Sequence, residues 1–485
     1  MRGAWLTRFV FLRLLGFVCV AAFLSLIIQL DPLIGSNGLL PAAKFLDRLR
    51  QVSGFNPWLQ LPTIFWFNCS DSFLMAMAAL GLLLSLLLLG GLANGILLAS
   101  IWVIYLSFVH IGQIFYGYGW EILLLETCFL GIFLVPWVDP RPFPKEPPAK
   151  AVIWLFWWLA FRIMFGAGLI KMRGDACWRD LSALCFHFET QPIPNPLSPF
   201  FHHLPALVLK AGVLWNHFVE LVVPFFVLGP RRWRNLGGWL IISFQIFLIL
   251  SGNLSFLNWL TIAACIPILD DGALAPLMPK RWVALAAERA QSPAPPGAAR
   301  QTVIYLVTAF LVLLSIPPAL NMASPRQIMN TSFEPLHLVN TYGAFGSVGR
   351  TRNEIILEGT DEATLGLGTK WKEYEFWAKP GDVRRMPPVI APFQPRLDWQ
   401  IWFAAMSTID REPWLVSLIF KLLQNDRGVL RLMANNPFPD HPPTYIRAEL
   451  YEYKFTRAGD RSGAWWERKR VDSYLRPVSL EDYLR

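Results

Sequence analysis

Residues 166–205 read GAGLIKMRGDACWRDLSALCFHFETQPIPNPLSPFFHHLP. The stretch lies between two long apolar segments, yet it carries six charged side chains and three of the chain's seven histidines. A connection that only joins two membrane spans needs few residues, and functional groups tend to lie on loops held by a rigid framework. We therefore expect a polar loop around which an otherwise apolar chain is organised.

The composition predicts a membrane protein. The chain has 485 residues, of which 54% are hydrophobic and only 16% are charged, and its mean hydropathy is +0.40. A soluble protein carries about 25% charged residues. Because apolar runs of about 20 residues indicate membrane helices, we expect a polytopic α-helical membrane protein with about nine spans. The expected spans are residues 5–30, 72–89, 92–109, 119–135, 151–170, 206–228, 236–250, 256–269 and 302–316.

The basic residues are concentrated in the membrane half. Residues 1–316 carry 21 Lys and Arg against 14 Asp and Glu, whereas residues 317–485 carry 22 against 20. With the N-terminus inside, the inner segments hold twelve Lys and Arg and the outer loops seven, as the positive-inside rule expects. The basic excess therefore indicates topology rather than nucleic-acid binding. It puts the central loop and the C-terminal part on the outer or lumenal side.

We expect two domains. Residues 1–316 are the transmembrane domain, with outer loops 31–70 and 171–205. In the first loop, residues 42–52 place apolar side chains opposite Lys44, Arg48 and Arg50, which suits a short helix on the membrane surface. Residues 317–485 are expected to form an extramembrane α+β domain, with strands at 355–357, 374–377, 445–455 and 465–471 and helices at 397–406 and 414–423.

Four ionisable residues lie within or beside expected spans, where a charge is costly and therefore a functional candidate. His217 and Glu220 share one face of the sixth span, and Glu121 and Glu126 lie in the fourth. They fit a buried proton relay or general base, and His with Glu three residues apart also fits a metal site in a helix bundle. The alternative is that they form interhelical ion pairs with one another, or with Arg162 and Lys171.

The central loop offers further candidates. Asp175, Arg179 and Asp180 are expected to form an ion-paired network. His187 and Glu189 lie on the same side if their segment is extended, where they either grip a substrate or hold the loop. Three prolines between residues 192 and 196 make the next segment stiff. That segment is either a docking strip or a device that sets the angle at which the chain re-enters the membrane.

Familiar catalytic motifs are missing from the sequence. It has no Gly-x-Ser-x-Gly elbow, no P-loop and no His-Glu-x-x-His motif, which argues against the hydrolase, nucleotide and zinc-protease classes. Gly343-x-x-Gly346-x-x-Gly349 lacks the spacing of a dinucleotide fingerprint and is typical of a turn. We therefore expect no cofactor and no metal.

The central stretch strongly resembles the lipase maturation factor family. The matching motifs are Leu169-Ile-Lys171, Arg173-Gly-Asp175-x-Cys177-Trp-Arg-Asp-Leu181 and His187-x-Glu189-Thr-Gln-Pro192-x-Pro-Asn-Pro-Leu197. The resemblance extends over nearly the whole chain through WEILLLET at residues 120–127, Asn340-Thr-Tyr-Gly343, Pro395-Arg-Leu-Asp-Trp399 and Asn436-Pro-Phe-Pro439.

This resemblance implies a multi-pass protein whose animal relatives lie in the endoplasmic reticulum membrane and help secreted lipases fold and assemble. Its C-terminal region would face the lumen, or the outer side of a cytoplasmic membrane if the source is bacterial. The partners would be a secreted, lipase-like client and the lipid bilayer. The client-binding or structural residues of the motif would be Lys171, Arg173, Asp175, Trp178, Arg179, Asp180, His187, Glu189, Gln191 and Asn195.

The membrane half is also distantly similar to the membrane domain of vitamin K-dependent carboxylase, at His217-x-x-Glu220 and Gly252-Asn-x-x-Phe256-x-Asn258. Two hypotheses follow. In the first, the chain is a chaperone-like maturation factor that catalyses no reaction. In the alternative, it is an integral-membrane enzyme acting on a lipid, a quinone or a polypeptide in a pocket lined by His217, Glu220, Glu121 and Glu126.

Overall fold

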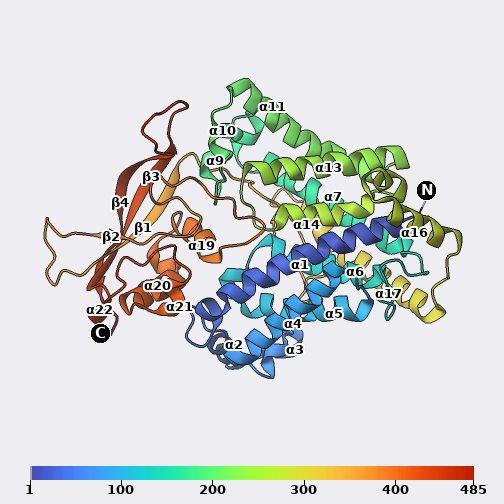
Figure 1. Ribbon diagram of the computed structural model, residues 1–485, viewed down its shortest axis with the longest axis horizontal. Coiled ribbons are helices and arrows are strands. Elements are labelled where there is room, and N and C mark those ends of the chain that lie inside the picture. Colours follow the sequence, from blue (N-terminus) through green and yellow to red (C-terminus); the bar gives the residue numbers. More distant parts are fainter. Residues whose placement is uncertain (1–2, 485) are drawn as a thin grey trace.

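The structure, a computed structural model, describes residues 3–484. Figure 1 shows a bundle of long helices with a smaller α+β part at one end. The N-terminal end of the chain lies at the far end of the bundle, and the C-terminal end lies beside the sheet (Figure 1).

Helix α1 (Trp5–Ile34) runs through the middle of the bundle and packs along α4 (Asp71–Gly90). It is apolar nearly all round, as expected of a helix covered by neighbours on most sides. Two glycines let the pair approach closely. A Cβ at Gly16 would lie 2.7 Å from the Leu89 backbone nitrogen, and one at Gly81 would overlap the Phe23 ring.

Within the described residues, six helical segments are long and apolar enough to cross a membrane. They are α1, α4, α7 (Lys150–Arg173), the segment Ala206–Val227, α13 (Arg231–Ser251) and the segment Ala298–Ala323. The other three expected spans coincide with shorter helices, α5 (Gly95–Ile111), α6 (Gly119–Leu134) and α14 (Leu257–Cys265). A multi-pass membrane protein is thus supported, but the expected count of about nine spans is not confirmed.

Two of the crossing segments are compound. Ala206–Val227 consists of α11 (Ala206–His217), a π-helical turn η3 (Phe218–Val222) and α12 (Val223–Val227). Ala298–Ala323 consists of α17 (Ala298–Leu314) and α18 (Ile316–Ala323). The last segment therefore continues past residue 316, and the division of the chain at that residue stays a prediction.

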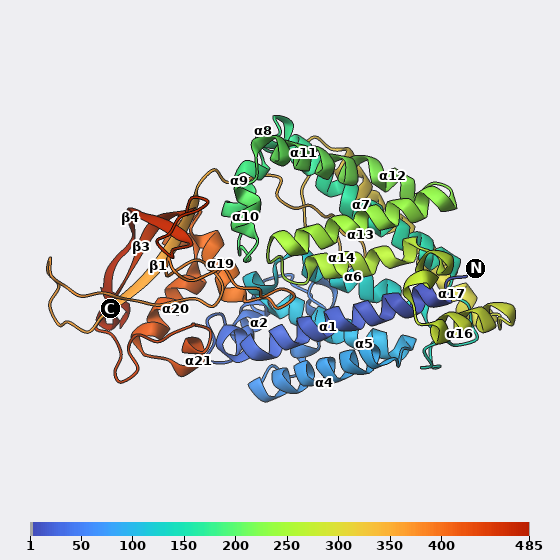
Figure 2. The ribbon, with the colours of Figure 1, turned by 45° about the horizontal axis from the view of Figure 1, so that its top comes forward.

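The outer loops contain short helices. Loop 31–70 holds α2 (Ala42–Arg50), α3 (Pro57–Gln60) and the turn η1 (Ile64–Trp66). The central loop holds α8 (Ala176–Arg179), α9 (Leu184–Thr190) and α10 (Ser198–His202). Figure 2 shows α9 and α10 between the helix bundle and the sheet. At the other end of the bundle, α15 (Asp271–Leu274) and α16 (Lys280–Gln291) precede α17.

The C-terminal part is built on an antiparallel sheet in the order β2-β1-β3-β4. Its strands are β1 (Arg352–Thr360), β2 (Lys372–Glu373), β3 (Tyr445–Phe455) and β4 (Trp466–Ser479). Helices α19 (Arg396–Ala404), α20 (Pro413–Leu423), α21 (Arg427–Leu430) and α22 (Leu480–Leu484) accompany it. One face of the sheet, including Ile355, Leu357 and Ala448, joins the core that contains α20.

The expected strand at 374–377 is wrong. Pairing with β1 stops after Lys372 and Glu373, and the chain then turns away, leaving only a bridge between Phe376 and Met433. Tyr374 and Phe376 are apolar and alternate because they pack into the core rather than extend the sheet. Strand β4 is longer than expected, and its pairing with β3 is interrupted by bulges. Bulges and charged side chains are the usual protection of an exposed sheet edge.

Candidate functional site

Glu121 of α6 is fully buried and pairs with a cation from the C-terminal part. Arg396 Nη1 lies 2.8 Å from Glu121 Oε1, and neither side chain is exposed. Arg396 also donates to the Phe115 carbonyl at 2.5 Å and lies over the Tyr116 ring. The Tyr105 hydroxyl donates to the other Glu121 oxygen. Glu121 therefore forms a buried ion pair with an arginine that lies 275 residues away in the sequence.

Glu126, on the same helix, is the centre of a second buried contact with the C-terminal part. It pairs with Arg162 of α7, and it accepts hydrogen bonds from the Asn340 backbone nitrogen at 3.1 Å and the Tyr342 hydroxyl at 2.7 Å. Arg162 in turn donates to the Asn340 carbonyl at 2.6 Å. The pair is thus interhelical, as the ion-pair alternative expects, and it also holds the segment around Asn340, which follows the last candidate membrane helix.

Glu220 forms an ion pair with Lys171, the second of the two cations that the ion-pair alternative names. The Asn216 side-chain amide donates to Glu220 at 2.9 Å, while His217 Nε2 lies 2.9 Å from the Trp178 carbonyl. His217 and Glu220 thus have different partners. The π-helical turn η3 begins between them, and α7 can approach it closely because Gly168 has no side chain to meet Leu221.

The four ionisable candidates do not line one pocket. Each is paired or hydrogen-bonded to a different group. Within residues 3–484, no group of three His, Cys, Asp or Glu side chains is placed to hold a metal ion. The arrangement is therefore that of structural contacts, and it does not favour the enzyme alternative.

Asp175 connects the start of the central loop to the C-terminal part. Its carboxylate caps α8 by accepting from the Cys177 nitrogen at 3.0 Å, and it pairs with Arg350 at 3.0 Å. The backbone donor at Cys177 is the main reason why the pKa of Asp175 is lowered. Trp178 Nε1 donates to the Phe345 carbonyl at 2.8 Å. The partners thus come from the turn that the glycines at 343–349 build.

The expected network of Asp175, Arg179 and Asp180 does not form. Arg179 donates to the Met172 and Gly174 carbonyls, and Asp180 accepts from the nitrogen and hydroxyl of Ser182. Both are local contacts, because α8 is a single turn that points the two side chains apart. Arg173 instead reaches the C-terminal part, where it donates to Gln327 Oε1 at 2.7 Å and to the Met322 carbonyl at 2.8 Å.

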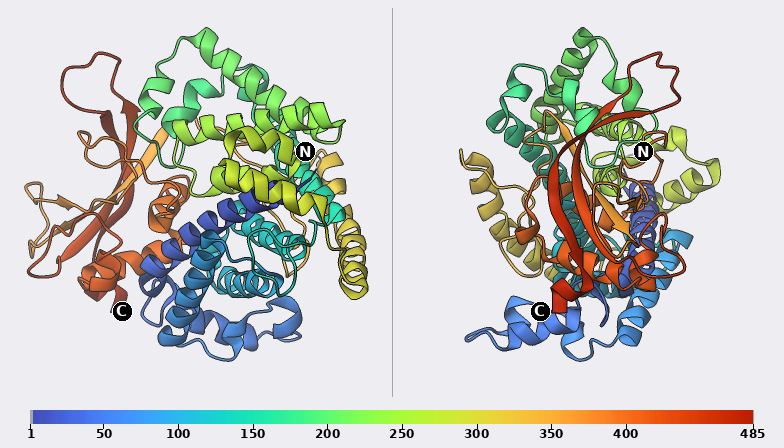
Figure 3. Two further views of the ribbon diagram at one scale, coloured as in Figure 1. Left: turned by 45° about the vertical axis from the view of Figure 1, so that its right-hand side comes forward. Right: turned by 90° about the vertical axis from the view of Figure 1, so that its left-hand side faces the viewer.

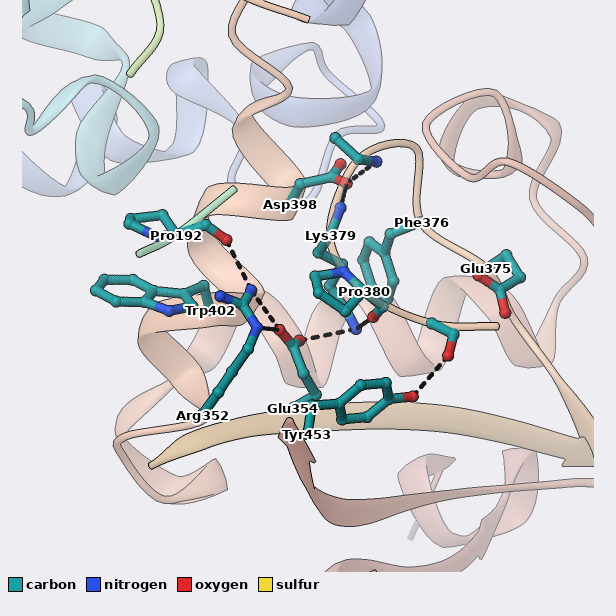
Figure 4. A network of polar contacts seen from close by, with 12 residues as sticks. Pro192, Arg352, Glu354, Glu375, Phe376, Lys379, Pro380, Asp398, Trp402 and Tyr453 are labelled. Atoms are coloured by element: carbon teal, nitrogen blue, oxygen red, sulfur yellow. Dashed lines mark hydrogen bonds and ion pairs between the residues drawn. The ribbon is translucent and has the colours of Figure 1, made fainter. Parts of the chain in front are cut away.

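Arg352 of β1 holds the second half of the central loop (Figure 4). It is 1% exposed and donates to the carbonyls of Glu189 and Pro192 at 2.9 Å, and also to that of Gln191. Glu354 balances its charge, with an Nε–Oε1 distance of 2.8 Å. A planar guanidinium with several fixed donors suits this role better than a lysine would.

The Arg352–Glu354 pair is the start of a larger buried network. Lys379 Nζ lies 3.0 Å from the second Glu354 oxygen, and Asp398 of α19 accepts from the backbone nitrogens of Ala378 and Lys379. Burial raises the pKa of Asp398 to about 6. Figure 4 shows how this network ties β1, the segment around Lys379 and α19 to the backbone at Pro192.

The expectation that His187 and Glu189 face the same way is wrong, because both lie in helix α9 rather than in an extended segment. The Glu189 carboxylate accepts from the Phe455 nitrogen of β3 at 2.8 Å and lies 3.6 Å from His202 Nε2. The His187 ring packs edge-on against Phe345, with centroids 4.6 Å apart. Burial lowers the pKa values of His187 and His202 to about 4.

The proline segment is not an exposed docking strip, because residues 191–195 are buried. Gln191 Nε2 donates to the Ser251 carbonyl at 2.9 Å, and Asn195 Nδ2 donates to the Leu250 carbonyl at 3.1 Å. The proline segment instead runs between the end of α13 and the buried network of Arg352. The family-like motif is therefore a junction between the bundle and the C-terminal part in its second half, whereas Arg173, Arg179 and Asp180 of its first half are exposed.

Three of the junction's central residues have little signal in the sequence. Arg396 lies in a motif that carries the family resemblance but is not itself a candidate, and the sequence favours a solvated basic surface for Arg350, Arg352, Arg384 and Arg385, whereas Arg352 is 1% exposed. Asn253 was noted only as part of a motif, yet its side chain donates to the Pro194 and Pro388 carbonyls and accepts from the nitrogens of Ile390 and Ala391. A single polar residue followed by an apolar run gives no local signal of such a role.

Comparison with known proteins adds to this geometry. The model of the lipase maturation factor transmembrane domain matches residues 6–276, and that of the lipase maturation factor C-terminal domain matches residues 338–476. The chain is 47% identical to lipase maturation factor 1 of Bos taurus, over 99% of its length and 90% of the relative. It is 44% identical to the Homo sapiens protein of that name, covering 88% of it, and 31% identical to lipase maturation factor 2 of Rattus norvegicus, covering 84%. No solved structure matches the chain significantly.

Proposed function

The chain belongs to the lipase maturation factor family, and from this membership we propose that it is a membrane-anchored factor that assists the folding or assembly of secreted lipases. The family name supplies the class of client. The multi-pass architecture supplies the anchor, and we propose the endoplasmic reticulum as the membrane. With nine spans and the N-terminus inside, the count of twelve inner against seven outer cations supports a lumenal C-terminal part.

The proposal rests on a difference between two surfaces of the C-terminal part: one packs against the bundle at the junction, and the other lies far from the bundle and is exposed. The buried motif residues, among them His187, Glu189, Gln191 and Asn195, are part of the junction, so we look for the client contact on exposed surface. The loop between β1 and β2 extends away from the helix bundle (Figure 1). Its Leu367 is fully exposed and Leu365 is 43% exposed. Exposed apolar groups on an otherwise polar surface are typical of protein contact sites.

This loop is ordered at its base and open at its tip. The Gly366 nitrogen donates to the Thr369 hydroxyl at 2.9 Å, and the Lys370 nitrogen donates to Glu362 Oε1 at 2.9 Å. A side chain added at Gly366 or Gly368 would meet no atom within 4 Å. The two leucines are thus presented on a short loop with a fixed base, which suits contact with apolar surface on an incompletely folded client.

The test is secretion of active lipase from cells that lack their own maturation factor and express this chain. We expect the wild-type chain to restore secreted activity. The double variant Leu365→Ser/Leu367→Ser should bind less lipase in crosslinking experiments and restore less activity at equal protein level. Val389→Ser is the matched control, because Val389 is 76% exposed but lies next to the contact of Ile390 with Asn253 at the bundle.

Two results would count against the proposal in different ways. If the wild-type chain restores no lipase activity, the maturation function is wrong. If the double variant binds and matures lipase as well as Val389→Ser does, the function stands but the β1–β2 loop is not the contact surface.

A further inference from the structure

Loop 31–70 lies beside the helix bundle, not beyond its end. Figures 1 and 3 both show α2 and α3 on the flank of the bundle, next to α4 and α5. The Thr63 hydroxyl donates to the Ser107 carbonyl at 3.2 Å, and the Ile64 nitrogen donates to the Ser107 hydroxyl at 3.1 Å. Ser107 precedes the end of α5 at Ile111 by one helical turn, or about 6 Å. The loop is therefore held at a depth that the bundle itself occupies.

The loop carries a cluster of exposed apolar side chains on its outward side. Leu59 is 70% exposed, Phe67 79% and Trp58 53%. The Trp58 and Phe67 rings lie 5.1 Å apart, although 9 residues separate them in the sequence. A soluble surface scatters large apolar residues singly, whereas a cluster of this kind indicates a partner.

Hydrogen bonds hold the turn that carries this cluster. The Asn56 side chain caps α3 by accepting from the nitrogens of Trp58 and Leu59. Trp66 is buried behind the cluster, where its Nε1 donates to the Leu61 carbonyl at 2.8 Å and Arg50 lies over its ring. On the C-terminal side, the chain enters α4 only four residues after Phe67.

We propose that residues 52–67 form a wedge that inserts Trp58, Leu59 and Phe67 into the lipid leaflet nearer the C-terminal part. This goes beyond the proposed maturation function, because the occupant is phospholipid and not the client. The chain runs from the cluster into α4, a candidate membrane helix on which Leu80, Leu83 and Leu86 are exposed. Tryptophan beside the end of a span is expected at the bilayer interface, and Trp, Phe and Leu form the apolar face of segments that lie in it.

Charge on the neighbouring helix fits the same occupant. α2 turns Ala42 and Leu46 inward and exposes Lys44, Arg48 and Arg50. Asp47 is its one exposed acid, and it is bonded to Arg50. Two cations thus stay free to contact lipid phosphates while the wedge lies among the acyl chains, the arrangement of an interfacial amphipathic helix.

The test uses an environment-sensitive fluorophore on a cysteine in the full chain, reconstituted in phosphatidylcholine nanodiscs. The background is Cys69→Ser/Cys185→Ser, because the other four cysteines are buried. We label Leu59→Cys at the wedge and Leu367→Cys at the far loop as the matched control. Thermal unfolding of each unlabelled variant checks that it folds like the wild-type chain.

We expect the label at residue 59 to lose most of its fluorescence when a lipid carries a nitroxide near its carbonyl group, and to be protected from iodide in the water. The label at residue 367 should show the reverse. If residue 59 is quenched by iodide as strongly as residue 367 is, the wedge lies in water and the proposal is wrong. Protection from both quenchers would indicate cover by protein and would also overturn it.

A second measurement tests the cations separately. Adding phosphatidylserine to the nanodiscs should increase the amount of this lipid that co-purifies with the chain after detergent extraction. The double variant Lys44→Gln/Arg48→Gln should reduce this enrichment while leaving the quenching at residue 59 in place. If phosphatidylserine is enriched equally with both chains, α2 does not contact this lipid.

Discussion

The contact between Arg396 and Glu121 allows a direct test of how the C-terminal part is attached. The perturbation is the set Glu121→Met, Arg396→Met and the double variant. Methionine is chosen because it is unbranched, flexible and uncharged and fills irregular apolar space. Neither side chain is exposed in the wild-type protein, so each single variant leaves a buried, unbalanced charge.

The magnitude follows from that burial. Removing one partner of a buried ion pair costs about 3–5 kcal/mol, whereas replacing both partners with apolar groups is often nearly neutral. Arg396 keeps its bond to the Phe115 carbonyl and its place over Tyr116 when Glu121 is lost, which favours the lower end of the range. We expect about 3 kcal/mol for each single variant, and a double variant that costs clearly less than their sum.

The assay is hydrogen exchange of the amides of α19, measured in nanodiscs. When exchange follows local opening, about 3 kcal/mol corresponds to exchange roughly a hundredfold faster. Each single variant should therefore speed exchange in α19 about a hundredfold, and the double variant should recover part of the protection. The control is Arg141→Gln, which breaks an exposed pair with Asp139 and should leave exchange in α19 unchanged, because exposed ion pairs contribute little to stability.

The reasoning fails if Glu121→Met leaves exchange in α19 unchanged. It also fails if the effects of the two single variants simply add in the double variant, because independent costs would mean that the two charges do not stabilise one another.

Three further predictions follow from the junction and the bundle. Folding lowers the pKa values of His187 and His202 from 6.5 to about 4, so the stability they contribute is present above pH 6.5 and is lost as the pH falls towards 4. The variant His202→Gln should therefore show a smaller change of melting temperature between these pH values. An unchanged slope would contradict this prediction. Arg352→Gln should make residues 189–192 cleavable by protease at neutral pH, and Arg352→Lys should not restore resistance, because one ammonium cannot reproduce the guanidinium contacts. Gly16→Leu should lower the yield of folded protein by separating α1 from α4, whereas Gly90→Ala, which meets no atom within 4 Å, should not; equal yields would refute the close contact.

The parts of the fold that sequence predicts well are those set by local periodicity. Six helical segments could be placed from apolar runs, because a bilayer imposes one length and one polarity on every helix that crosses it. The sequence predicts the strand at 445–455 with the bounds it has in the structure, since it is rich in Tyr, a residue favoured in strands. The segment 374–377 alternates in the same way but packs into the core, which local pattern cannot distinguish from a strand.

The site was less predictable because its contacts join residues far apart in the chain. Polarity in the apolar half gave Arg162 and Lys171 as possible partners of the buried acids, and both pairs form. It gave no sign of Arg396 and placed Arg352 on a solvated surface, although Arg352 is 1% exposed. The expected network around Asp175 failed for the same reason: the nearest opposite charges in the sequence point outward, while the actual partner is Arg350, 175 residues away.

The junction also has a consequence for how the two parts are separated in an experiment. Deleting the C-terminal part would leave Glu121 without Arg396, and it would remove the Asn340 and Tyr342 bonds that share the charge of Glu126 with Arg162. A buried carboxylate without its partners costs several kcal/mol, so the truncated bundle is expected to misfold. Loss of client binding after such a truncation would therefore not identify the C-terminal part as the receptor. Substitutions at exposed positions such as Leu365 and Leu367 do identify it, because they leave every junction contact in place.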